Sequence, residues 1–460
     1  MNANEQVLKC RDDRKPVVFR REGELASGAE AFRVNTDTPC SWAKPDEPFG
    51  IDKLRPRIEP WLTALCQSDH LSLLLGAGLT IATQRVATDN ASSGMGTEDF
   101  GEFKSLVDEE AKKSAQTSGR SDGNIEDQIR VANELLRGYQ ILGPSDKAFS
   151  DKAEALQKQL NGVLGEFAAN ILKGERNLIT SGTEQRELAF EYLVSFLMSF
   201  ASRSGTRDRL HIFTTNYDRL VEAGAEVAGI HLLDRFVGSV APIFRSSRLD
   251  LDLHYNPPGI RGEPRYLEGV ARFTKLHGSL DWVDVNRNIR RLGIPFGAES
   301  VDPHLKLSGG DALEATRLMI YPNAAKDRET TVYPYVELFR DFAAAVCRPN
   351  HTLVVFGYSF GDEHISRIIE DMLTIPSTHL VVMAHSDPLG RIIKTYERLG
   401  RHAQITLLIG DHVGDFQTLV DHYLPKPAID RTTFRMAELL RARWTTGQQD
   451  VNKSDTDPPK

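Results

Sequence analysis

Short, uninterrupted apolar runs are the feature that most constrains the fold of this chain. The runs are Leu71–Leu75, His211–Thr214, Arg272–His277, Arg317–Tyr321, Thr352–Phe356, His379–Met383 and Ile405–Ile409. A strand with one face in water alternates apolar and polar residues, whereas a continuous apolar run indicates a strand covered on both faces. Helical patterns lie between the runs. The chain is therefore predicted to form an α/β fold around a mostly parallel sheet.

Composition excludes several classes of function. The 460 residues carry a net charge of -8, which argues against broad electrostatic binding to nucleic acid. No apolar run approaches the length of a membrane span, and the N-terminus MNANEQVLKCRDDRK lacks the apolar core of a signal peptide. None of the four cysteines forms a C-x-x-C pair, so no zinc site is predicted and free thiols in the cytoplasm are expected.

The spacing of the runs indicates a large insertion. Roughly 130 residues separate the first run from the second, far more than one crossover helix needs. We predict an inserted helical subdomain from about Asp89 to Gly205. Within it, Glu187–Phe200 (ELAFEYLVSFLMSF) is apolar nearly all round, so this helix must be buried either inside the chain or against a second subunit.

The rest of the chain divides around this insertion. Residues 1–50 are expected to form a polar extension with room for one short hairpin. Residues 51–425 form the main domain, 426–446 a C-terminal helix that is basic, and 447–460 a disordered tail.

Polar or glycine-containing turns follow four of the apolar runs. They are GAGLT from Gly76, TTNYD from Thr214, KLHGSLDW from Lys275 and GYSFGDEHI from Gly357. Ligands of open α/β sheets bind at the carboxyl ends of the strands, so these turns are candidate site segments. Each alone has an ordinary structural explanation. Glycines serve tight turns and helix packing, a lone histidine is more often structural than catalytic, and TTNYD could cap a helix.

Taken together and in this order, the four segments closely resemble those of the SIR2-like family. These are prokaryotic relatives of the sirtuins, and many act in defence against phages. The resemblance covers about residues 71–424 and implies the inverted Rossmann-like, NAD-binding fold of sirtuins. By resemblance, Gly76, Ala77 and Gly78 match the turn that holds the NAD phosphates.

The remaining segments carry the other functional residues of the family. Asn216 matches the asparagine near the nicotinamide ribose, and Asp218 the aspartate that helps to hold the carboxamide. His277 matches the catalytic histidine. Gly357 and Ser359 match a turn on the dinucleotide, and the segment 385–387 (HSD) is expected near the adenosine ribose.

The chemistry of these side chains agrees with cleavage of the bond between nicotinamide and ribose. Asn216 has a donor and an acceptor that can orient a ribose hydroxyl or water, and His277 can accept a proton near neutral pH. Thr214, Thr215 and Tyr217 are expected chiefly to support the turn, with Thr215 also counted among the cofactor-binding residues.

Two departures from the sirtuins narrow the expected activity. The P-D-F-R loop after the first glycine turn is replaced here by LTIATQRVATDN, and the four zinc cysteines are missing. Relatives without these parts tend to hydrolyse NAD, so the resemblance implies an NAD+ glycohydrolase that uses no metal and depletes NAD+ in abortive infection. An ADP-ribosyltransferase, a deacylase and a non-catalytic nucleotide sensor remain as alternatives.

Uncontrolled NAD hydrolysis would kill the host cell, so we expect the activity to be controlled by assembly or by a partner. Relatives use self-assembly, a sensor domain or a separate partner protein. We expect a homo-oligomer whose contacts include the helical insertion, and, by resemblance alone, a HerA-type ATPase as a further partner. The sequence leaves open the trigger, the oligomeric state and the choice between NAD and NADP.

Overall fold

The computed structural model describes residues 4–426, except 26–27, 29, 37, 46, 89–95, 118–121, 204–206, 248–250, 256–264, 287, 306–317 and 321–332. The C-terminal helix and tail expected after residue 426 lie outside the described residues. None of the helices in the described ranges has the length and apolar character that crossing a membrane requires.

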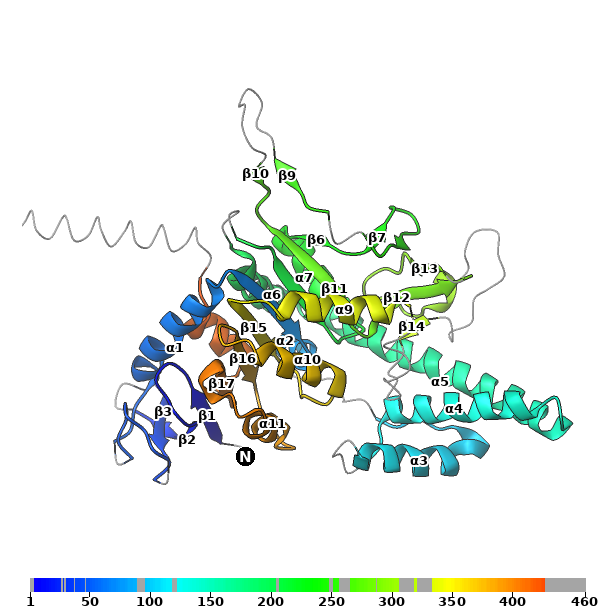
Figure 1. Ribbon diagram of the computed structural model, residues 1–460, viewed down its shortest axis with the longest axis horizontal. Coiled ribbons are helices and arrows are strands. Elements are labelled where there is room, and N and C mark those ends of the chain that lie inside the picture. Colours follow the sequence, from blue (N-terminus) through cyan, green and yellow to red (C-terminus); the bar gives the residue numbers. More distant parts are fainter. Residues whose placement is uncertain are drawn as a thin grey trace, which may run out of the picture.

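A ten-stranded sheet forms the centre of the molecule (Figure 1). Its strand order is β3-β2-β1-β17-β16-β15-β4-β5-β11-β6. The parallel strands are β4 (His70–Leu75), β5 (Leu210–Thr214), β6 (His231–Leu233), β11 (Val270–Lys275), β15 (His351–Phe356), β16 (His379–Ala384) and β17 (Ile405–Ile409). The predicted α/β fold with a mostly parallel sheet is confirmed.

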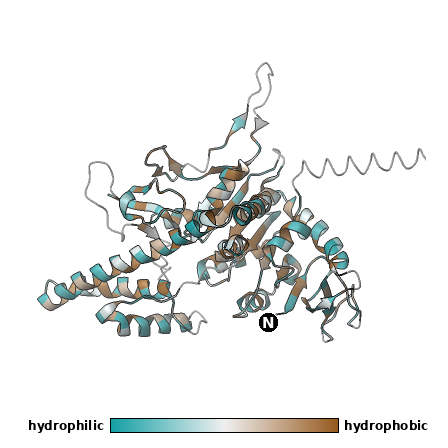
Figure 2. Cartoon of the chain, turned by 180° about the vertical axis from the view of Figure 1, so that it is seen from behind, coloured by the Kyte–Doolittle hydropathy of each residue, from teal (hydrophilic) through white to brown (hydrophobic). Residues whose placement is uncertain are grey.

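Helices cover both faces of this sheet, which explains why its strands are apolar throughout. Along β4, Leu73 packs in the core on one face and Leu74 in the core on the other. Figure 2 shows the strands as a brown centre between helices with teal outer faces. The first face is covered by α1 (Ile51–Cys66), α2 (Ala77–Thr88), α6 (Thr183–Ala201) and α7 (Leu220–Ala228), and the second by α9 (Tyr335–Val346), α10 (Glu363–Leu373) and α11 (Arg391–Leu399).

The first fifty residues differ from the expected polar extension. They add three antiparallel strands to the sheet, because β1 pairs with β17 and is followed by β2 and β3. Phe19, Phe32 and Phe49 are buried among these strands and α1. The short runs of β2 and β3 contain arginine and glutamate, so their apolar signal in the sequence is weak. The bounds are Glu5–Lys9, Val17–Glu24 and Glu30–Val34.

The predicted helical insertion divides into two parts. A helical arm, made of α3 (Lys104–Thr117), α4 (Ile125–Leu142) and α5 (Lys147–Thr180), projects from the body in Figure 1. Helix α6 instead packs on the main sheet, where Leu193, Phe196 and Phe200 are buried in the core. The apolar helix expected at Glu187–Phe200 is therefore buried inside the chain, the first of its two alternatives.

A second, five-stranded sheet lies beside the carboxyl end of β11. Its order is β14-β12-β13-β8-β7. The run Arg317–Tyr321, predicted as a strand of the parallel sheet, belongs here instead, because β14 (Leu318–Ile320) pairs antiparallel with β12. The other bounds are β7 (Phe236–Val237), β8 (Ile243–Phe244), β12 (Gly278–Val285) and β13 (Asn288–Arg291), with a separate hairpin of β9 (His254–Tyr255) and β10 (Arg265–Tyr266).

Candidate active site

A cavity of about 1200 Å³ opens at the carboxyl ends of the parallel strands. Strand order reverses there, since the chain adds strands on one side of β4 and then returns to β15 on the other. Such a switch point is the usual ligand site of an open α/β sheet. The lining residues include Ala77, Gly78 and Thr80 after β4; Thr215, Asn216 and Asp218 after β5; His277 after β11; Gly357, Ser359 and Asp362 after β15; His385 and Asp387 after β16; and Asn170, Lys173 and Glu175 of the arm.

Three glycines bring the turns after β4 and β15 into backbone contact. Gly78 N–H donates to the carbonyl of Gly357 at 2.9 Å. A Cβ on Gly76 would lie 2.5 Å from the Gly357 oxygen, and a Cβ on Gly78 2.5 Å from the Gly357 Cα. Gly357 also has a φ of +63°. The mutual approach of the two turns therefore requires these glycines, and it places the first residues of α2 on the cavity wall.

The amide of Asn216 is fixed in one orientation. Its Nδ2 donates to the carbonyl of Gly76 and to the hydroxyl of Thr80, both at 3.0 Å. A carbonyl only accepts, so the nitrogen must face Gly76 and both N–H groups are used. Asn216 thus offers a ligand its acceptor Oδ1, rather than the donor and acceptor expected from the sequence.

Asp218 completes this network and also binds the start of a helix. Its Oδ2 accepts from the Thr80 hydroxyl at 2.6 Å, and its Oδ1 accepts from Leu220 N–H at the start of α7 at 3.0 Å. The N-cap residue of α7 is Arg219, whose side chain makes no capping bond, so the TTNYD segment meets the helix through Asp218, one residue before the cap. Thr214 supports the turn as expected, because its hydroxyl donates to the Leu75 carbonyl and accepts from Asn216 N–H.

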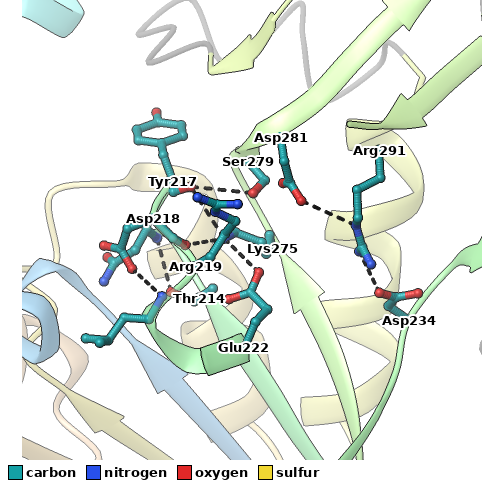
Figure 3. A network of polar contacts seen from close by, with 12 residues as sticks. Thr214, Tyr217, Asp218, Arg219, Glu222, Asp234, Lys275, Ser279, Asp281 and Arg291 are labelled. Carbon is teal, nitrogen blue, oxygen red and sulfur yellow. Dashed lines mark hydrogen bonds and ion pairs between the residues drawn. The ribbon is translucent and has the colours of Figure 1, made fainter. Parts of the chain in front are cut away.

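A buried lysine on the neighbouring strand β11 binds the backbone of the same turn. The Lys275 ammonium on β11 donates to the carbonyl of Asp218 and lies 3.1 Å from the Glu222 carboxylate. Figure 3 shows Lys275 with both partners. Lys275 is 1% exposed. Burial raises the pKa of Glu222, although the adjacent Lys275 acts to lower it. Lys275 thus binds the backbone carbonyls of Tyr217 and Asp218 and holds the turn in place.

His277 stands at the junction of the two sheets. Strand β11 ends at Lys275 and β12 begins at Gly278, whose φ of +87° lets the chain reverse. The His277 ring lies 6.4 Å from the ring of Tyr217, and its Nε2 is 2.9 Å from Oδ2 of Asp362. A carboxylate partner for the histidine was not predicted from the sequence.

The segment after β16 contributes the buried carboxylate of Asp387 to the cavity wall. Two arginines, Arg85 and Arg391, also lie on that wall. Asp387 is 4% exposed and accepts from Ile393 N–H at 3.1 Å. Arg85 of α2 is 3.2 Å from the ring of His385, and Arg391 begins α11. Both arginines line the cavity, and neither was singled out in the sequence.

Comparison with known protein families bears on this arrangement. Residues 210–407 match the SIR2-like domain family. The match supports the SIR2-like family and indicates an NAD-related function. The matched segment begins at β5 and ends within β17. Strand β4 and its glycine turn precede that segment in the sequence, but in the sheet β4 lies between the matched strands β15 and β5. No curated protein matches the chain.

The fold brings the predicted site residues to one place. Ala77, Gly78, Thr215, Asn216, Asp218, His277, Gly357 and Ser359 all line the cavity. Gly76 acts beside them through its carbonyl, which holds Asn216. Thr80 and Asp362, like Arg85 and Arg391, are polar lining residues that were not singled out from the sequence. The only sequence feature that could have identified Thr80 and Asp362 is their position, because each lies shortly after the glycines of a turn segment already singled out.

Metal ligation has no support within the described part of the chain. No group of three or more His, Cys, Asp or Glu side chains there could hold a metal ion. The four cysteines, all within the described ranges, are free thiols.

Proposed function

We propose that this protein is an NAD+ glycohydrolase that cleaves the nicotinamide–ribose bond with water. The observation that carries the proposal is the convergence, on one cavity, of the Asn216–Thr80–Asp218 network and the His277–Asp362 pair. A pure binding module needs neither an asparagine with an oriented acceptor nor a histidine paired with a carboxylate.

The size of the cavity suits a dinucleotide, and part of its wall can bind a pyrophosphate. Pockets for drug-sized ligands measure roughly 300–1,000 Å³, and this cavity is larger, at about 1200 Å³. Helix α2 begins at its wall, and the N-terminus of a helix favours negative charge. Arg85 and Arg391 add positive charge for a pyrophosphate.

The proposed chemistry balances with water as the acceptor. The C–N glycosidic bond breaks and its electron pair goes to the nicotinamide nitrogen, so positive charge develops on the ribose. Asn216 Oδ1 accepts a hydrogen bond from a ribose hydroxyl or from the attacking water. His277 takes the proton released as the new C–O bond forms, and that proton later passes to solvent. The products are ADP-ribose, nicotinamide and one proton.

Product analysis tests this proposal directly. Purified protein is incubated with NAD+, and nicotinamide, free ADP-ribose and protein-bound ADP-ribose are quantified by chromatography and mass spectrometry. Equal amounts of nicotinamide and free ADP-ribose are expected. Modified protein without free ADP-ribose would replace the hydrolase with a transferase, and loss of an acyl group from an acylated peptide would replace it with a deacylase. If the protein binds NAD+ but does not cleave it, either alone or with the product of the neighbouring gene, the protein would instead be a nucleotide sensor.

We further propose that the enzyme depletes cytoplasmic NAD+ in antiphage defence and is controlled by assembly. Helix α6 is buried within the chain, so its apolar surface no longer argues for a second subunit. The proposed homo-oligomer therefore rests on resemblance, as does the proposed HerA-type ATPase partner. The arm is our candidate contact surface, since Leu106, Ile141 and Leu142 expose 46%, 61% and 46% of their area there. Light scattering of the protein and of Ile141→Lys tests this. A wild type that stays monomeric at micromolar concentration and is fully active alone would exclude it.

A further inference from the structure

The carboxylate of Asp362 makes two separate hydrogen bonds. Its Oδ2 lies 2.9 Å from His277 Nε2, and its Oδ1 accepts from His364 N–H at 2.9 Å as the N-cap of α10. Because a carboxylate only accepts, a neutral His277 must carry its proton on Nε2. The nitrogen with a free lone pair is then Nδ1.

The position of Asp362 is strongly determined. The residue is 3% exposed. Its backbone N–H donates to the Tyr358 hydroxyl at 3.1 Å, and its carbonyl accepts from the Ser366 hydroxyl at 2.8 Å. The N-terminus of α10 stabilises the ionised carboxylate. The group facing His277 is therefore a fixed anion at the end of a helix of eleven residues.

We propose that Asp362 is the positioning residue of the reaction. It holds the His277 imidazole with its proton on Nε2, presents Nδ1 as the base, and stabilises the imidazolium formed when Nδ1 takes a proton. Asp362 touches neither substrate nor the reacting atoms in this role. The inference rests on the proposed function, because a base is required only if the protein performs such chemistry.

The step moves one proton and leaves the bonding of Asp362 unchanged. His277 Nδ1 takes the proton of the attacking water or ribose hydroxyl, and the Nε2–H bond to Asp362 is kept throughout. The charge that develops on the ring lies beside the carboxylate, whose attraction is strong at this buried site. The proton on Nδ1 then leaves to solvent, which restores the neutral ring.

Asp362→Asn isolates the positioning role from the structural one. Asparagine caps helices about as well as aspartate, so Oδ1 can keep its bond to His364 N–H. Its Nδ2 then donates toward His277 Nε2, which forces the ring proton onto Nδ1 and removes the base. We expect kcat for NAD+ cleavage to fall by at least about a hundredfold, with KM changed by less than about threefold and no loss of fold.

A spectroscopic readout separates this role from a merely structural one. In ¹⁵N-histidine spectra, assigned with His277→Gln, wild-type His277 should be the Nε2–H form and the Asp362→Asn protein the Nδ1–H form.

Asp146→Asn is the matched control. Asp146 caps α5 on the arm through Ala148 N–H at 2.9 Å, away from the cavity lining, so the same change there should leave kcat and the His277 spectrum unaltered. An Asp362→Asn protein with wild-type kcat, or with His277 still in the Nε2–H form, would overturn the positioning role while the hydrolase stands. A wild type that never cleaves NAD+ would overturn the hydrolase, and with it the role assigned to Asp362, whatever the tautomer.

Discussion

Glu175 of helix α5 and Arg219 of the turn after β5 form a buried ion pair that joins the arm to the candidate active site. The Glu175 carboxylate accepts from Arg219 N–H at 3.0 Å, from its Nε at 3.1 Å, and from Gly297 N–H at 3.0 Å. Burial acts to lower the pKa of Arg219, but Glu175, together with Asp281 and Glu222, outweighs it and the pKa is raised. Figure 3 shows Arg219 directly beside Asp218.

Removing Glu175 should therefore destabilise the protein strongly. Glu175→Ala leaves Arg219 buried without its counter-ion, which costs about 3–5 kcal/mol in free energy of unfolding. Urea denaturation followed by circular dichroism measures the change. The control is Glu59→Ala, which breaks the exposed pair with Arg55 on α1 and should cost about 0.5 kcal/mol or less. A cost below about 1 kcal/mol for Glu175→Ala would mean that the pair does not anchor the arm.

The catalytic assignment predicts loss of turnover without loss of fold. Asn216→Ala removes the oriented acceptor and His277→Ala removes the base, so each should lower NAD+ cleavage by at least about a hundredfold. Nicotinamide release measures the rate, and thermal melting reports the fold. His231→Ala, an exposed histidine on edge strand β6, is the control and should retain full activity. Wild-type turnover in either site variant would refute the assignment.

The glycine contact between the turns after β4 and β15 predicts a sharp steric penalty. In Gly78→Ala, the new Cβ would meet the Gly357 Cα at 2.5 Å, and backbone cannot move aside cheaply. We expect a loss of about 1–3 kcal/mol in stability and impaired NAD+ cleavage. Gly138→Ala is the matched control, because no described residue outside the adjoining backbone of α4 lies within 4 Å of a Cβ there. The change should stabilise that helix by up to about 1 kcal/mol. Equal melting temperatures for the two variants would contradict this account.

Buried histidines predict a loss of stability in mild acid. Burial lowers the pKa of His351 to about 3 and that of His379 to about 4. Below an unfolded pKa near 6.5 the unfolded chain binds a proton that the folded chain refuses, so stability falls as pH decreases from about 6.5 toward these values. Neither ring nitrogen of His351 has a hydrogen-bond partner among the described residues.

The variant His351→Leu measures one such contribution. Urea unfolding of both proteins at pH 7.5 and pH 5.5 gives the difference in their free energies of unfolding. The wild type should lose about 1.4 kcal/mol more than the variant over this interval, because leucine has no proton to bind. Parallel pH dependence in the two proteins would show that His351 does not titrate in this way.

The continuous apolar runs predicted the central sheet well, because a strand buried on both faces has no other pattern. The same reasoning misplaced Arg317–Tyr321, which forms β14 of the second sheet. A run of three to five apolar residues does not encode its pairing partner. Strands β2 and β3 were missed as sheet strands for the opposite reason, since charged side chains interrupt their apolar residues.

The candidate site was predicted residue by residue wherever a short motif carried the signal. Asn216 and His277 follow predicted strands directly, so their meeting at one edge of the sheet followed from parallel pairing. Partnerships between distant residues carried no such signal. The bond between His277 and Asp362 spans 85 positions of sequence. The bond that fixes the Asn216 amide spans 140.

The sequence by itself determined which segments are strands, which turns carry polar side chains, and the order in which they occur, because these properties are local and periodic. Only the tertiary structure decided that Asn216 presents an acceptor, that His277 has a carboxylate partner, and that Glu175 of the arm supports the turn beside them. Hydrogen-bond geometry depends on positions to within a fraction of an ångström, and those positions are set by packing between strands that lie far apart along the chain.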